Sequence, residues 1–129
     1  MALVVPNVGE ELALTRFLKT ANETLKLFTN NITPAETDTD ATYTECSIGG
    51  YSAATLTAAS WTVTPGAPSD GAYAEQTFTF TGTFGATVYG YYVVDAGVGT
   101  LMWAERDAAP YTPANSGDQI KITPTITAD

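Results

Sequence analysis

The sequence predicts a mainly β protein: an antiparallel β-sandwich or jelly-roll-like body of about seven strands, preceded by an extended N-terminal arm and one short helix. From Tyr43 onward, segments such as YAEQTFTFTG (73–82) and TVYGYYVVD (87–95) alternate small polar residues with apolar or aromatic ones. This period of two is typical of strands with one buried and one solvated face. Clusters of Gly, Pro, Ser and Asp separate the segments, as expected for antiparallel strands joined by turns.

The length of 129 residues fits one structural domain. Within it we expect residues 1–23 to form the arm and the helix, and residues 24–129 to form the β-body. No apolar run approaches the roughly 20 residues that a membrane span requires. The first residues lack the cationic start and the continuous apolar core of a secretion signal, so neither a membrane span nor a secretion signal is predicted.

The net charge of −9 is unevenly distributed. Acidic and basic residues balance within residues 1–30, so the whole excess lies in the remainder, where Arg106 and Lys121 are the only cations. Such a body lacks the basic surface that binds phosphate backbones, which argues against nucleic acid as a partner. The acidity also keeps a protein soluble at high copy number.

The first nine residues are expected to be extended. Leu3, Val4 and Val5 precede Pro6, which biases its neighbour away from helix. Two interpretations stay open: the apolar arm docks on another molecule, or it forms the first strand of the protein's own sheet.

Helical periodicity follows over residues 9–21, where Leu14, Phe17, Leu18 and Ala21 share one face. Glutamates at its start and basic residues later in the segment complement the helix dipole. After Asn22 the period changes to two. Strands are then expected at 24–29, 43–48, 54–64, 73–82, 87–95, 101–106 and 119–127. Polar loops rich in turn formers are expected at 29–42 and 65–71, and Pro124 places the end of the last strand at a sheet edge.

One face of these strands is predicted to form the core. The alternation assigns the following inward positions: Trp61, Val63, Phe78, Phe80, Val88, Tyr92, Val94, Leu101, Trp103, Ile120 and Ile122. On another row, Tyr89 and Tyr91 are either core or an aromatic interface that binds a protein or a sugar ring.

The residue types argue against an enzyme. Histidine is absent, so the commonest general base is missing and nucleophile pairs that use it are impossible. The carboxylates Glu75, Asp95, Glu105 and Asp107 are the remaining candidates for acid–base chemistry, and we expect them to lie on solvated strand faces. No catalytic residue and no cofactor are predicted.

No metal site is predicted either. Cys46 is the only cysteine, which excludes an intrachain disulfide and a four-ligand zinc site and suggests a small buried apolar side chain. The acidic residues Glu36, Asp38 and Asp40 alternate as in calcium loops. They lack the glycine at position six and the acidic residue at position twelve of that motif.

Several segments together resemble a family of small virion structural proteins encoded by tailed bacteriophages. They run in the same order over nearly the whole chain: VPNVGE (5–10), LKLFTNNITPAETDT (25–39), Gly50-Tyr51, YAEQTFTFTG (73–82), TVYGYYVVD (87–95), LMWAER (101–106) and NSGDQIKITP (115–124). The family has no catalytic motif that could be transferred to these positions.

This resemblance implies a structural protein made in the bacterial cytoplasm and located in the virion. The first hypothesis is a capsid decoration or cement protein, a homo-oligomer such as a trimer, bound to the major capsid protein on the outside of the shell. The alternative is a tail or fibre component whose aromatic sheet face binds a tail protein or a host glycan. The candidate assembly residues are Leu3, Val4, Val5, Leu14, Phe17, Leu18, Tyr89 and Tyr91.

Overall fold

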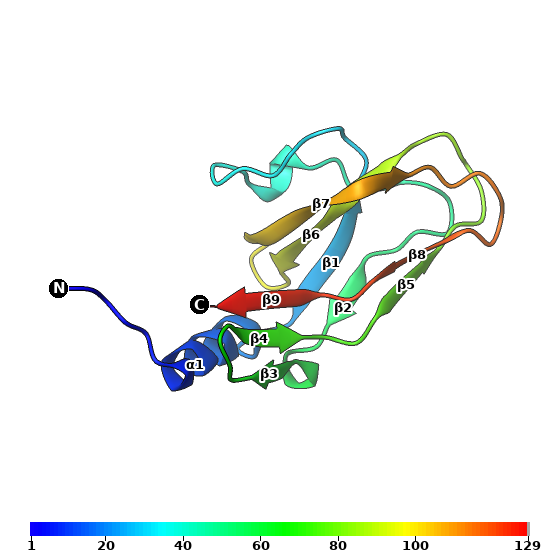
Figure 1. Cartoon of the computed structure of the whole chain (residues 1–129). Helices are drawn as coiled ribbons and strands as arrows, with labels where there is room; N and C mark the ends of the chain where they lie inside the picture. Colours follow the sequence, from blue (N-terminus) through cyan, green and yellow to red (C-terminus); the bar gives the residue numbers. More distant parts are fainter. Residues whose placement is uncertain (129) are drawn as a thin grey trace.

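The computed structural model describes residues 1–128 and is mainly β, with one α-helix and several antiparallel sheets (Figure 1). Asp129, the last residue of the expected β-body, lies outside the described residues. The helix α1 spans Asn7–Leu18. The strands are β1 (Glu23–Phe28), β2 (Ala54–Leu56), β3 (Thr62–Thr64), β4 (Ser69–Ala72), β5 (Gln76–Thr79), β6 (Val88–Asp95), β7 (Leu101–Tyr111), β8 (Gln119–Ile122) and β9 (Thr125–Ala128).

The largest sheet has the order β2-β1-β6-β7, with antiparallel pairs throughout. Phe28 at the end of β1 lies opposite Gly90 of β6. A methyl group on Gly90 would collide with the Phe28 ring and with the carbonyl oxygen of Glu105 on β7. Glycine at this position therefore lets a large aromatic ring pack directly on the backbone of the central strand.

The remaining strands form a second, interrupted ribbon. β4 pairs with β9 and β5 pairs with β8, while Tyr73 N–H donates to the Pro124 carbonyl between them (3.0 Å). At this junction two residues, Ala74 and Glu75, lie opposite one residue, Thr123. The extra residue forms a β-bulge between β4 and β5. Pro124 cannot donate a ladder hydrogen bond, so the segment predicted as one strand over 119–127 divides there into β8 and β9.

The main core lies between the four-stranded sheet and the other strands. Leu25, Leu27 and Val93 of the large sheet pack with Trp61, Phe78 and Phe80. The opposite face of the large sheet is covered by the segment after β1, where the Tyr43 ring stacks on Tyr92 at 4.9 Å between centroids. β6 is therefore buried on both faces, so its side chains do not follow the predicted alternation of buried and solvated residues.

Most of the predicted core is confirmed. The buried positions are Trp61, Phe78, Phe80, Val88, Tyr92 and Val94. The partly buried positions packed against the two clusters are Val63, Leu101, Trp103, Ile120 and Ile122. Cys46 is a free, buried cysteine, as predicted.

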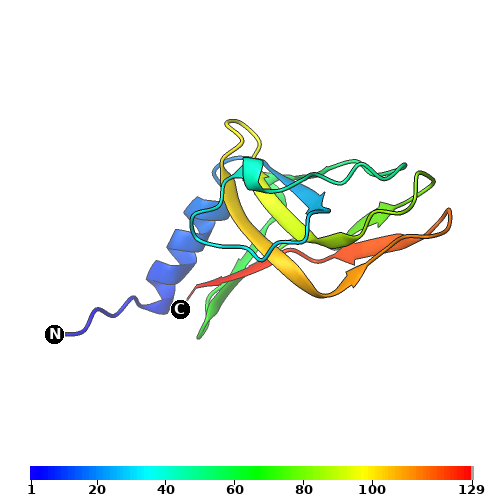
Figure 2. The ribbon, with the colours of Figure 1, turned by 90° about the horizontal axis from the view of Figure 1, so that it is seen from above.

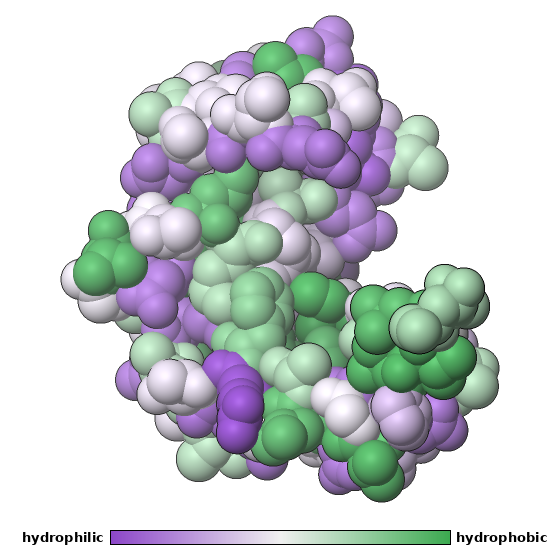
Figure 3. Space-filling model, turned by 90° about the vertical axis from the view of Figure 1, so that its left-hand side faces the viewer, coloured by the Kyte–Doolittle hydropathy of each residue, from purple (hydrophilic) through white to green (hydrophobic). Residues whose placement is uncertain are grey.

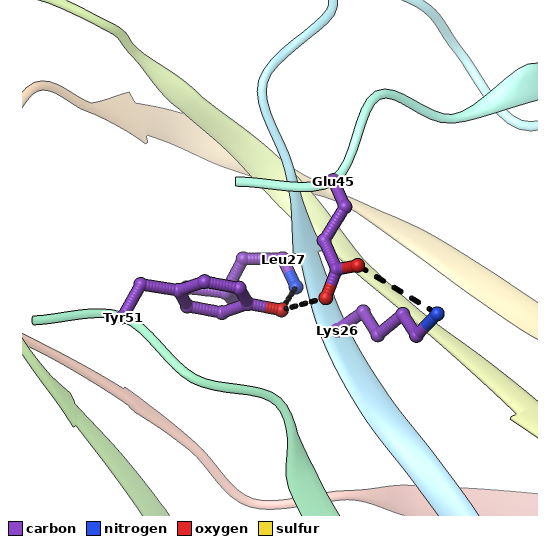
Figure 4. Close-up of polar contacts among 4 residues, drawn as sticks. All are labelled: Lys26, Leu27, Glu45 and Tyr51. Atoms are coloured by element: carbon purple, nitrogen blue, oxygen red, sulfur yellow. Dashed lines mark hydrogen bonds and ion pairs between the residues drawn. The ribbon is translucent and has the colours of Figure 1, made fainter. Parts of the chain in front are cut away.

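The segment 43–48 was predicted as a strand, but it touches the large sheet at only a few points. It is held to the end of β1 by the Cys46 N–H bond to the Leu27 carbonyl (2.8 Å) and by an isolated bridge between Phe28 and Glu45. Figure 4 shows the side chains that fix it: the Tyr51 hydroxyl donates to Glu45 (2.9 Å), whose other oxygen lies 3.7 Å from Lys26 Nζ.

Other element boundaries differ from the predicted ones. The helix begins at Asn7 and ends at Leu18, so the expected range of 9–21 was displaced towards the C-terminus and Ala21 lies outside it. The expected strand 54–64 is divided by a short 3-10 helix at Ala58–Ser60. The expected loop 65–71 contains most of β4, because small residues there permit pairing between β3 and β9.

Candidate functional site

An apolar surface is left uncovered at the N-terminal end of the described chain. Residues 1–6 are extended and lead directly into α1, projecting away from the β-body in both ribbon views (Figures 1 and 2). Leu3 is 92% and Val4 77% exposed. On the first turns of the helix, Val8 is 72% and Leu12 49% exposed. We call residues 1–6 the arm, and Val8 with Leu12 the outer face of α1.

The opposite face of α1 packs on the chain's own strands. Leu14 and Leu18 are buried, and a methyl group on Gly71 of β4 would collide with Leu18. The buried carboxylate of Glu10 accepts a hydrogen bond from the Ser69 hydroxyl of β4 (3.1 Å). Leu14 and Leu18 were predicted as assembly residues, and this prediction was wrong because the chain itself covers both side chains.

Phe17 joins the helix to the edge of the large sheet. Its ring lies 5.9 Å from that of Trp103 on β7, and Trp103 lies 5.9 Å from Trp61 in the core. Phe17 nevertheless remains 41% exposed. It therefore belongs both to the packing of the helix and to the accessible surface.

This side of the molecule is hollowed. Figure 3 shows strongly hydrophobic side chains gathered at one rim of the hollow, with weakly hydrophobic surface lining its floor. A pocket of about 440 Å³ lies between the loop at 34–38 and the start of β7, from Leu101 to Ala104. The apolar surface is therefore next to a concave face, a combination common at sites of protein association.

The predicted aromatic row of Tyr89 and Tyr91 does not exist as one row. A register shift between Val88 and Gly90 reverses the side-chain alternation of β6. Tyr91 is buried in the main core, whereas Tyr89 packs with the cluster on the opposite face, beneath the Arg106 guanidinium at 5.1 Å. The two rings therefore cannot form a single binding face.

A second cavity, of about 410 Å³, lies between β7 and β8. Its floor includes Leu27 and Val88, and the Tyr91 hydroxyl donates at 2.8 Å to Glu105 at its wall. Burial and this neighbouring carboxylate raise the pKa of Tyr91 to about 12. Of the four carboxylates considered for acid–base chemistry, only Glu105 and Asp107 reach this cavity, while Glu75 is exposed elsewhere.

Glu23 is the most unusual titratable group. It is 1% exposed, pairs in register with Asp95, and has a pKa raised to about 7 by burial. The Trp61 indole opposes this rise and Asp95 adds to it. Within residues 1–128, neither Glu23 Oε2 nor Trp61 Nε1 has a hydrogen-bond partner. The Glu23 side chain is buried, so it is not an accessible site.

The acidic loop is organised by its own hydrogen bonds. Asp38 accepts bonds from the Ala35 N–H and from the Tyr43 hydroxyl, both at 2.8 Å. Residues 1–128 contain no group of three side chains arranged to hold a metal ion. None of their helices combines the length and the apolar character needed to cross a membrane.

Sequence reasoning identified the arm but missed the outer face of α1. Val8 and Leu12 are four residues apart, so they share a helix face. The expected helix began at residue 9, which separated Val8 from Leu12 and hid the second apolar stripe.

Comparison with protein-family models, with curated proteins and with solved structures finds no match for this chain.

Proposed function

We propose that the chain is a virion structural protein of a tailed bacteriophage, a decoration protein that packs on the outside of the major capsid protein shell. The observation that carries this proposal is the apolar surface of the arm and the outer face of α1, which the chain itself leaves uncovered. The segments that resemble small phage structural proteins support the same assignment. In this proposal the three sheets act as one sandwich-like body that projects from the shell.

The energetics favour an assembly role for this surface. Burial of apolar area contributes about 25 cal/mol per Å², so covering Leu3, Val4, Val8 and Leu12 favours docking. Several linked copies multiply that effect through avidity. The acidic chain, with its net charge of −9, keeps the subunit soluble before assembly.

The test is the location and copy number of the chain in purified particles. Emptied heads are separated from detached tails, and each fraction is analysed by quantitative mass spectrometry. A decoration protein is expected on heads, in a copy number comparable to that of the major capsid protein. A few copies confined to tails would overturn this proposal in favour of a tail or fibre component.

A further inference from the structure

The molecule has two unpaired sheet edges that face each other. β7 is the last strand in the order β2-β1-β6-β7, and β8 pairs only with β5. In the described part of the chain, no backbone hydrogen bond links the outer edge of either strand to another segment. The cavity of about 410 Å³ lies between these edges. We call this cavity with its two flanking strands the seam.

The seam suits an extended apolar segment. Leu27, Val88, Ile120 and Ile122 contribute apolar side chains to it, while the free edges offer backbone donors and acceptors. A strand added here would cover the apolar side chains and pair with the backbone groups of the two edges, as in the recognition of extended peptides by sheet edges. Left open, two such edges invite uncontrolled pairing between molecules.

The arm has the properties of such a segment. It is extended, its residues 1–5 make no backbone hydrogen bond within the described chain, and its side chains are exposed. Six extended residues reach about 20 Å, and Pro6 ends the run because it has no N–H to donate. The arm projects from the opposite side of the molecule to the seam (Figure 1), so it does not reach its own seam.

Charge favours this contact between copies. Two copies of the chain, each with a net charge of −9, repel each other over most of their surfaces. Residues 2–6 carry no charged side chain. The charged side chains at the seam are Glu105, Asp107 and Lys121, because the Arg106 guanidinium lies over Tyr89 on the opposite face of the sheet. An uncharged arm can therefore enter the seam of a second copy with little electrostatic repulsion.

We propose that the arm of one copy inserts as a strand into the seam of a second copy, between β7 and β8, and so links the chain into a homo-oligomer. Reciprocal exchange closes a dimer, and head-to-tail exchange closes a ring. This inference concerns contact between copies and does not depend on a location in the virion. With the arm bound to a second copy, the outer face of α1 is the part of the apolar surface that remains for the shell.

The first test is self-association of the full chain, measured by sedimentation over a concentration series. Val4→Asp is expected to weaken association on the order of a hundredfold, because it places a charge in an apolar strand site. Val98→Asp is the matched control, since Val98 is 81% exposed on a distant hairpin, and association should be unchanged.

The acceptor side has its own pair of variants. Ala108→Trp adds bulk inside the seam, whereas the neighbouring exposed Ala109 does not line it. Ala108→Trp is expected to block association and Ala109→Trp to preserve it. Far-ultraviolet circular dichroism checks that all four variants remain folded.

The second test locates the contact. A photo-crosslinking residue at position 4 is introduced into isotope-labelled chain, which is mixed with unlabelled chain. Crosslinks from the arm to 105–108 or 120–123 of the other copy are expected. A wild type that stays monomeric at the highest concentrations, an unaffected Val4→Asp variant, or crosslinks to other segments would each overturn the proposal. Loss of binding to phage heads with self-association intact would affect only the proposed function.

Discussion

The β-body and the N-terminal region are both rich in apolar side chains, but only the body covers them with its own strands. Leu25, Leu27 and Phe80 have no exposed surface, whereas Leu3 and Val4 are almost fully exposed. The contrast is sharpest within α1, where Leu14 and Leu18 face the body while Val8 and Leu12 face away. Apolar composition alone therefore does not distinguish a core from an assembly surface; the distinction depends on which side of the helix meets the sheet.

The largest expected difference between the two regions is in stability. Phe80→Ala should lower the free energy of unfolding by about 3–5 kcal/mol, because it removes a fully buried ring. Leu12→Ala should change it by no more than about 0.5 kcal/mol, since half of that side chain is already exposed. Urea denaturation of both variants measures the contrast. Equal losses would show that the outer face of α1 is part of the folded core.

Glu23 makes the stability of the body depend on pH. Its pKa is about 7 in the folded protein against 4.5 ordinarily, so the folded state holds this proton more tightly. The contribution of Glu23 to the free energy of unfolding is fully present below pH 4.5. As the pH rises to about 7, this contribution of about 3 kcal/mol is lost.

Glu23→Gln keeps the neutral form at every pH. The variant should therefore gain stability over the wild type mainly between pH 5 and pH 8, as measured by denaturation at several pH values. Glu75→Gln, at an exposed position, is the matched control and should show no such gain. A constant difference between Glu23→Gln and the wild type across this range would contradict the assignment.

Gly90 tests how closely the two faces of the large sheet pack. Gly90→Ala should cost about 1–3 kcal/mol, because the added methyl group meets the Phe28 ring and the backbone of β7. Gly82→Ala is the control, since a methyl group there meets nothing within 4 Å. Thermal unfolding of the pair gives the comparison. Similar melting temperatures would mean that Phe28 moves aside without cost.

The sequence predicted most of the body and only part of the candidate surface. Alternation located the buried residues of β5 and the ends of β6, because period two directly reports a half-buried strand. The alternation did not predict the side-chain directions and the burial of β6, because this strand departs from a regular strand with one solvated face. The bulge before Gly90 separates Tyr89 from Tyr91, and the covering segment after β1 buries both faces of β6. These are tertiary effects that no local pattern records.

The helix shows the same limit. Its periodic positions identified Leu14 and Leu18 as members of one face. Whether that face is buried depends on β4, where Gly71 contacts Leu18 and Ser69 donates a hydrogen bond to Glu10. Because residues 65–71 were predicted to be a loop, the strand β4 was not expected. Without β4, the sequence offered no way to decide which helix face stays uncovered.

The central claim is that the outer face of α1 is an intermolecular surface of the virion. The most direct measurement is binding of the purified full chain to phage heads that lack it, for wild type, Leu12→Glu and Val98→Glu. Glutamate preserves helix propensity at position 12, and Val98 is an exposed apolar control outside the region. The account predicts that wild type and Val98→Glu decorate the heads while Leu12→Glu, still folded, does not. Full occupancy by Leu12→Glu would contradict it.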